Sequence, residues 1–184
     1  MKSPSFSKLI RTFFVIMCLI VNTSPYANSL FNIFPEKIGR ARFAIHDKTQ
    51  SGEIVVQLWY PINGDDKAEP NIGPIKHAAE AWNAPVATIA KLPLIVISHG
   101  WGGSPELLAW FADGLAKNGF FVAIPQHISD ITIPPSFNSW HRPLDISLVI
   151  NQLTKSSYKD IIDFNRIGFA GYSLGSATGI WWDC

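Results

Sequence analysis

Residues 167–175, IGFAGYSLG, join an apolar run to a Gly-x-Ser-x-Gly pattern. The apolar run is typical of a buried strand, and a helix can begin directly after it. A serine at such a sharp strand-to-helix turn is held in the open, where a base can activate its hydroxyl. Gly171 and Gly175 leave the room that this turn needs, because strand and helix approach each other closely there. The pattern therefore predicts a nucleophilic Ser173.

The first 29 residues have the pattern of a secretory signal peptide. Basic residues come first, followed by an uncharged run over residues 13–21 and then by small and polar residues. We expect residues 1–29 to be removed and residues 30–184, which are enough to bury one core, to be secreted or periplasmic. The uncharged run is shorter than the roughly 20 apolar residues of a membrane span, so no stable span is expected. An uncleaved N-terminal membrane anchor is the alternative.

Charge and cysteine content exclude several classes of partner. Fifteen basic and 14 acidic residues give a net charge of +1, and no basic cluster stands out after the leader, so nucleic acid is not an expected partner. Of the 2 cysteines, Cys18 lies in the leader and Cys184 is the last residue. The mature chain therefore cannot close an internal disulfide, and it has no Cys/His spacing typical of a metal site.

Two strand candidates at residues 41–46 and 53–60 are separated by a polar turn, which predicts an opening hairpin. A long polar and Pro-rich connection follows over residues 62–92. We expect it to carry a short helix near residues 77–82. It is either a surface excursion or the rim of a substrate pocket.

The buried-strand run at residues 94–98 leads directly into the sequence HGWGG at residues 99–103. Backbone N–H groups of such a loop can point at a developing oxyanion without side chains in the way. We expect the N–H of Trp101 or Gly102 to join that of Leu174 in this role. The alternative is that the loop glycines, which are Gly100, Gly102 and Gly103, only make a tight turn.

Strands and helices alternate from here to Ser173. A helix is expected to begin at Ser104 and Pro105, with Leu107, Leu108, Phe111 and Leu115 on one apolar stripe. A buried strand at residues 120–124 and a helix from Arg142 to residue 153 follow. This order predicts a mostly parallel sheet with crossover helices.

Three further residues are candidates for the pocket. His99 is expected to brace the glycine loop, and His127 follows the strand at residues 120–124, where such folds keep their sites. Arg142 is a candidate substrate contact. For His127 the alternative is a loop residue bonded to backbone. For Arg142 the alternative is an exposed or half-buried ion pair with Asp145, an acid in the first turn that the helix dipole favours.

Taken together, these motifs resemble the first half of an α/β-hydrolase. Four segments further resemble the dienelactone hydrolases and their relatives, the platelet-activating-factor acetylhydrolases: WYP at residues 59–61, SHG at 98–100, RPLDI at 142–146 and DFNRIGFAG at 163–171. The likeness covers about residues 38–175. One departure is that dienelactone hydrolases proper use a cysteine nucleophile, whereas Ser173 stands at the elbow here.

The resemblance implies hydrolysis of a carboxylic ester or lactone through an acyl-enzyme on Ser173, with a small ester, a lactone or a lipid as substrate and no cofactor. In this fold the triad acid and histidine follow the serine in sequence. Only residues 174–184 follow Ser173, and they contain Asp183 and no histidine. The resemblance therefore implies that the triad acid and base are not in this chain. His127 or His141 could be proposed as a substitute base, but nothing in their spacing favours either.

Two interpretations follow. In the first, the chain is the N-terminal part of a secreted serine esterase, truncated after the elbow and nearly inactive by itself, because serine and histidine act as a unit. In the second, it is a non-catalytic binding or interaction protein with an α/β-hydrolase-like fold. Oligomeric state and the identity of the acyl and alcohol groups have no signal in the sequence.

Overall fold

The computed structural model describes residues 37–46, 52–63, 79–87, 90–128 and 139–182. All of them belong to one compact unit, Pro35–Cys184, which is distinct from Met1–Phe34. The predicted signal peptide and Asp183 lie outside the described residues. Within the described part of the chain, no helix is long and apolar enough to cross a membrane.

A six-stranded sheet with the strand order β3-β1-β2-β5-β4-β6 forms the centre of the unit. The predicted hairpin is confirmed, since β1 and β2 pair antiparallel from Ile38 opposite Pro61 to His46 opposite Glu53. The strands are β1 Lys37–His46, β2 Glu53–Pro61, β3 Ala79–Trp82, β4 Leu92–Ser98, β5 Phe121–Gln126 and β6 Ile162–Gly171.

The three strands that lead to the proposed site run parallel. β4 pairs parallel with β5 on one side and with β6 on the other. The crossovers carry η1 Pro105–Leu108 with α3 Ala109–Lys117, and then η3 Ser139–His141 with α4 Arg142–Leu153. The chain continues from β6 into α5 Leu174–Trp182. The predicted α/β architecture with crossover helices is therefore confirmed.

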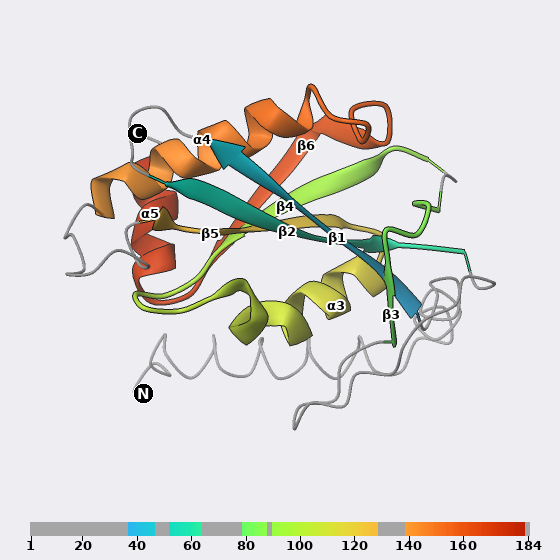
Figure 1. Cartoon of the computed structure of the whole chain (residues 1–184), viewed down its shortest axis with the longest axis horizontal. Helices are drawn as coiled ribbons and strands as arrows, with labels where there is room; N and C mark the ends of the chain where they lie inside the picture. Colours follow the sequence, from blue (N-terminus) through green and yellow to red (C-terminus); the bar gives the residue numbers. More distant parts are fainter. Residues whose placement is uncertain (1–36, 47–51, 64–78, 88–89, 129–138, 183–184) are drawn as a thin grey trace, which may run out of the picture. The chain divides into compact units, whose positions relative to one another are not determined.

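Both faces of the sheet are covered, with α3 on one side and α4 on the other (Figure 1). Successive residues of a strand point to opposite faces. In β5, Phe121 and Ala123 accordingly join the core beneath α4, whereas Val122 and Ile124 join the core beneath α3. Each fully buried large side chain of this kind contributes about 1.5–3 kcal/mol to stability.

The expected helix near residues 77–82 is wrong, because Ala79–Trp82 forms β3. This strand pairs parallel with the beginning of β1. The Asn83 N–H then donates to the Arg40 carbonyl at 2.7 Å, and Asn83 turns the chain with a φ of 57°. The free edge of β1 supplies backbone partners that a local helical preference does not outweigh.

The expected apolar stripe on the first crossover helix is only partly present. Leu108, Phe111 and Leu115 pack against the core beneath α3, but Leu107 is exposed. The helix starts with the 3₁₀ segment η1, and Ser104 makes no side-chain cap hydrogen bond. A 3₁₀ turn has three residues instead of 3.6, so it rotates the side chains before α3 away from the expected phase.

A chain of polar side chains ties η1 to the first strands of the sheet. Arg40 forms an ion pair with Glu80 at 2.5 Å and donates to Gln57 at 2.5 Å, and Gln57 in turn donates to Glu106. The Arg40 guanidinium lies 4.0 Å from the centroid of the Trp59 ring. Burial alone would raise the pKa of Glu106, but hydrogen bonds from Ser104 and Gln57 outweigh it and lower the pKa below its ordinary value.

Two glycine-to-alanine substitutions, one in β1 and one in α3, should change the free energy of unfolding in opposite directions. A Cβ at Gly39 would lie 2.1 Å from Cε2 of the fully buried Tyr60, which stacks on Phe121 and cannot move aside. Gly39→Ala should therefore lower the free energy of unfolding by about 3 kcal/mol. A Cβ at Gly114, in the exposed part of α3, would meet nothing within 4 Å, so Gly114→Ala should raise it by about 0.5–1 kcal/mol. Urea denaturation measures both, and equal effects of the two would contradict the packing.

Glu106 should make stability depend on pH. Because its pKa is lower in the folded chain than in the unfolded chain, its contribution is present above the unfolded pKa and is lost as the pH falls through the folded pKa. Glu106→Gln should reduce the slope of unfolding free energy against pH between about pH 5 and pH 3. Unfolding midpoints measured over this range give the slope. An identical slope in both proteins would show that the Gln57 and Ser104 contacts do not favour the carboxylate.

Candidate active site

Ser173 lies in the turn between β6 and α5 and has the strained backbone expected of a nucleophile at such a turn. Its φ is 53°, a value that non-glycine residues rarely adopt, and its side chain is exposed. A Cβ at Gly171 would lie 2.3 Å from the Gly175 carbonyl oxygen, and one at Gly175 would lie 1.9 Å from the Ser98 carbonyl oxygen. The glycines at both positions are therefore required by close approach of the backbone.

The glycine loop that follows β4 lies beside this turn. A Cβ built at Gly100 would be 3.4 Å from the Ser173 Cβ. The Tyr172 N–H donates to the Ser98 carbonyl at 3.1 Å, and the Gly103 N–H closes a turn onto the Gly100 carbonyl at 3.1 Å. Leu174 is the first residue of α5, where backbone N–H groups have no partner inside the helix. The loop and the elbow thus meet as predicted, and the oxyanion role of Trp101, Gly102 and Leu174 stays a prediction.

A cavity of about 310 Å³ opens next to the loop. Its wall consists of the glycine loop and of apolar side chains from η1, α3 and the elbow; the lining residues are His99, Gly100, Trp101, Gly102, Gly103, Leu107, Leu108, Trp110 and Tyr172. Leu107, which does not pack into the core, is therefore part of the cavity wall. The volume is at the lower end of the range for small-molecule sites, and the lining favours an apolar group.

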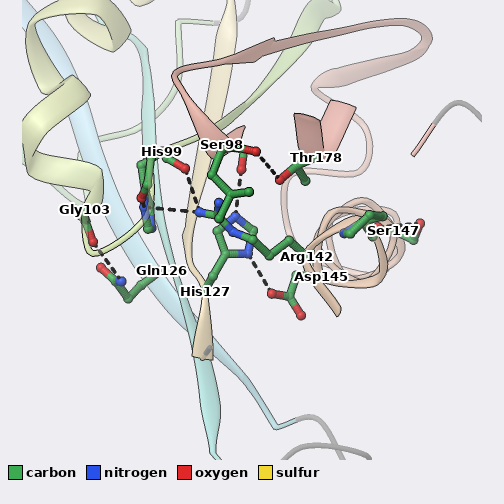
Figure 2. Close-up of polar contacts among 12 residues, drawn as sticks. Ser98, His99, Gly103, Gln126, His127, Arg142, Asp145, Ser147 and Thr178 are labelled. Carbon is green, nitrogen blue, oxygen red and sulfur yellow. Dashed lines mark hydrogen bonds and ion pairs between the residues drawn. The ribbon is translucent and has the colours of Figure 1, made fainter. Parts of the chain in front are cut away.

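Behind the loop, Ser98, His127 and Asp145 form a buried hydrogen-bonded row (Figure 2). His127 Nδ1 donates to Asp145 Oδ2 at 2.7 Å, since an ionised carboxylate can only accept. The other ring nitrogen, Nε2, lies 2.9 Å from the Ser98 hydroxyl oxygen. All three residues are at most 1% exposed. Both nitrogens of His127 therefore have partners that face away from solvent.

Arg142 is also fully buried and binds the backbone of the loop. Its Nη2 donates to the His99 carbonyl oxygen at 2.6 Å. The expectation of an exposed or half-buried Arg142 and Asp145 is therefore wrong, because both side chains point inward from the first turn of α4 to polar groups at the ends of β4 and β5. His99 lines the cavity as expected, whereas His127 and Arg142 lie behind the loop and do not line it.

Sequence reasoning missed Ser98 as part of the site, and it gave Asp145 only an ion pair with Arg142 and a favourable place at the start of the helix. Arg142 and Asp145 are three residues apart at the start of one helix, a spacing that places two side chains on the same face. Two charged residues on one face, next to a histidine that ends a buried strand, are a signal for a buried polar cluster. His141, the other substitute base considered, ends η3 and is partly exposed.

Comparison with known proteins agrees with this geometry. A family model described as platelet-activating factor acetylhydrolase, isoform II, matches residues 69–133, which include the glycine loop and end before Ser173. The platelet-activating factor acetylhydrolase of Cavia porcellus is 40% identical over 55 residues, or 30% of this chain and 12% of that protein. The one from Canis lupus familiaris is 44% identical over 46 residues, or 25% and 10%.

Solved structures show the same fold over most of the chain. A ferulic acid esterase from Streptomyces cinnamoneus superposes with a TM-score of 0.68 at 22% identity, covering 80% of this chain and 55% of that one. A predicted dienelactone hydrolase from Klebsiella pneumoniae gives 0.51 at 13% identity, covering 79% and 54%. The chain thus spans about half the length of these structures and a small part of the curated relatives. The chain therefore has the fold of the α/β-hydrolases, and part of its sequence is similar to the platelet-activating factor acetylhydrolases.

Proposed function

We propose that this chain carries the nucleophile of an exported serine hydrolase that cleaves carboxylic esters or lactones through an acyl-enzyme on Ser173. The observation that carries the proposal is the exposed Ser173 at a φ of 53°, directly beside a glycine loop. A backbone strained in this way is costly, and such strain is concentrated at functional sites.

In the proposed reaction, the Ser173 oxygen attacks the ester carbonyl carbon while its proton passes to a base. The carbonyl oxygen becomes an oxyanion, which the N–H groups of Leu174 and of Trp101 or Gly102 would stabilise. The alcohol then leaves with a proton, and water releases the acid in a second step of the same kind. His127 is a poor base for Ser173, since its ring is buried between Ser98 and Asp145. We expect the acid and base to lie outside the described residues.

The cavity supports an ester with an apolar group. Trp101, Trp110 and Tyr172 offer broad apolar surfaces, and the other lining side chains, apart from His99, are leucines. The similar proteins are described as acetylhydrolases of platelet-activating factor and as a ferulic acid esterase, names that both refer to ester cleavage. A small ester, a lactone or a lipid ester remains the proposed substrate class.

The competing proposal is a binding protein that keeps the loops without the reaction. The buried Ser98–His127–Asp145 row fits this alternative as well, because its hydrogen bonds hold the loop end of the sheet whether or not a reaction takes place. Reactivity of Ser173 separates the two.

In the protein that supplies its acid and base, Ser173 should react with a fluorophosphonate probe, because the base that activates the hydroxyl for attack on an ester carbonyl also activates it for attack on phosphorus. Mass spectrometry of the digested chain should locate the label on Ser173. Ser173→Ala should abolish labelling, whereas Ser156→Ala, at a turn hydroxyl after α4, should leave it unchanged. Labelling of the wild-type chain no faster than Ser173→Ala would support the binding protein. Turnover of a p-nitrophenyl ester then tests whether deacylation follows.

Export predicts a shortened chain. Expression of residues 1–184 in a secreting host should yield a product whose first residue lies close to position 30, as N-terminal sequencing would show. The physical reason is that the uncharged run at residues 13–21 enters the export machinery but is too short to remain as a membrane span. Recovery of Met1 in the membrane fraction would instead favour the uncleaved anchor.

A further inference from the structure

Two side chains outside the loop hold its carbonyl groups at both ends. At the start, Arg142 Nη2 donates to the His99 carbonyl oxygen at 2.6 Å. At the end, Gln126 Nε2 donates to the Gly103 carbonyl oxygen at 3.2 Å. Figure 2 shows these contacts reaching the loop from α4 and from the end of β5. Neither donor is among the residues that line the cavity, and both bind backbone carbonyls of the loop.

The carbonyl of Gly100, which lies between those of His99 and Gly103, is bound by groups of the loop itself. The Gly100 carbonyl oxygen accepts from the Gly103 N–H at 3.1 Å and lies 2.8 Å from His99 Nδ1. A carbonyl can only accept, so the 2.8 Å contact places the proton on Nδ1; the longer 3.4 Å approach of Arg142 Nη2 to the same nitrogen is then not a hydrogen bond. In a planar trans peptide the N–H points opposite to the carbonyl. Holding the Gly100 carbonyl therefore sets the direction of the Trp101 N–H, one of the two loop N–H groups expected to face the oxyanion.

A loop of this composition needs such restraints. Glycine populates positive and negative φ with similar ease, and Gly102 already has a φ of 65°. Rotation of a single peptide would replace an N–H by a carbonyl oxygen at the oxyanion position. A carbonyl there would repel the negative charge that an N–H stabilises.

The restraint at His99 also joins the loop to the elbow. A Cβ at Gly175 would lie 1.9 Å from the Ser98 carbonyl oxygen and 2.9 Å from that of His99. The backbone of residues 98–99 thus packs against the first turn of α5 and also receives the hydrogen bond from Arg142. The hydrogen bond from Ser98 to His127, itself bonded to Asp145, fixes the end of β4. These contacts hold the glycine loop and the start of α5, which would supply the two oxyanion N–H groups, at a fixed distance from each other.

We propose that Arg142 and Gln126 are positioning residues for the glycine loop. By binding the carbonyls of His99 and Gly103 at its two ends, they keep the loop in the conformation in which its N–H groups face the oxyanion formed beside Ser173. This role rests on the proposed function, because it matters only if an oxyanion forms there. Arg142 suits the task, since its guanidinium is always charged and only donates.

The test compares the fluorophosphonate labelling rate of Ser173 in matched variants. Arg142→Met keeps most of the side-chain volume without a donor and should lower the rate constant about tenfold to a hundredfold, somewhat less than deletion of an oxyanion donor. Arg142→Lys keeps a charged donor and should recover part of the rate. Arg166→Met removes an exposed arginine that binds Asp163 and the Lys91 carbonyl, and it should label like wild type.

Loss of a buried arginine can also unfold the chain, so Gln126→Met is the second test. Gln126 is only partly buried, and its replacement should lower the rate several-fold with an unchanged thermal midpoint. Phosphorus NMR of the completed Ser173 adduct adds a readout that stability does not move, because the phosphonyl oxygen occupies the oxyanion position. Its chemical shift should differ from wild type in folded Arg142→Lys and in Gln126→Met.

The outcomes separate the two proposals. If wild-type Ser173 does not label in the protein that supplies its acid and base, the proposed function fails and the positioning role fails with it. If wild-type Ser173 labels, and Gln126→Met and folded Arg142→Lys match its rate and its phosphorus shift, the positioning role is overturned while the proposed function stands. A slow rate with a changed shift, in a chain that melts like wild type, supports the positioning role.

Discussion

The parallel pairing of β4 with β6 is the contact on which the site depends. In its register, Ser98 at the end of β4 pairs with Gly171 at the end of β6. Parallel strands end at the same edge of a sheet, so the glycine loop and the serine turn begin side by side although about 70 residues separate them in the sequence. A shift of one residue would reverse the faces of the strand and separate the two turns.

This closeness has structural costs that the surrounding residues offset. Ser173 has a left-handed backbone, and Gly175 approaches the Ser98 carbonyl too closely for any side chain. Such an arrangement persists only where its neighbours over-determine it. Here the neighbours are two apolar cores, one on each face of the sheet, and a buried polar row whose hydrogen bonds are short and shielded from water. Burial makes these bonds strong and makes the loss of one partner costly.

Much of this arrangement could be predicted from the sequence, because it follows from local pattern. The hairpin, the buried runs of β4 and β5 and the glycines around Ser173 each carry their signal within a few residues. β3 could not be predicted in this way, since its strand state depends on a free edge of β1 some 40 residues away. The exposure of Leu107 and the burial of Arg142 likewise depend on the 3₁₀ start of one helix and on the inward face of another, which residue type alone does not reveal.

The Ser98–His127–Asp145 row contains the residue types and the hydrogen-bond order of a catalytic triad, yet all three side chains are buried. Ser173 has the opposite combination: an exposed hydroxyl at a strained turn, without a described histidine bonded to it. The two serines therefore differ in exposure and in backbone conformation, although both stand at the ends of neighbouring strands. The buried row ties the ends of β4 and β5 to the first turn of α4, and the glycine loop begins directly after the Ser98 end of that row.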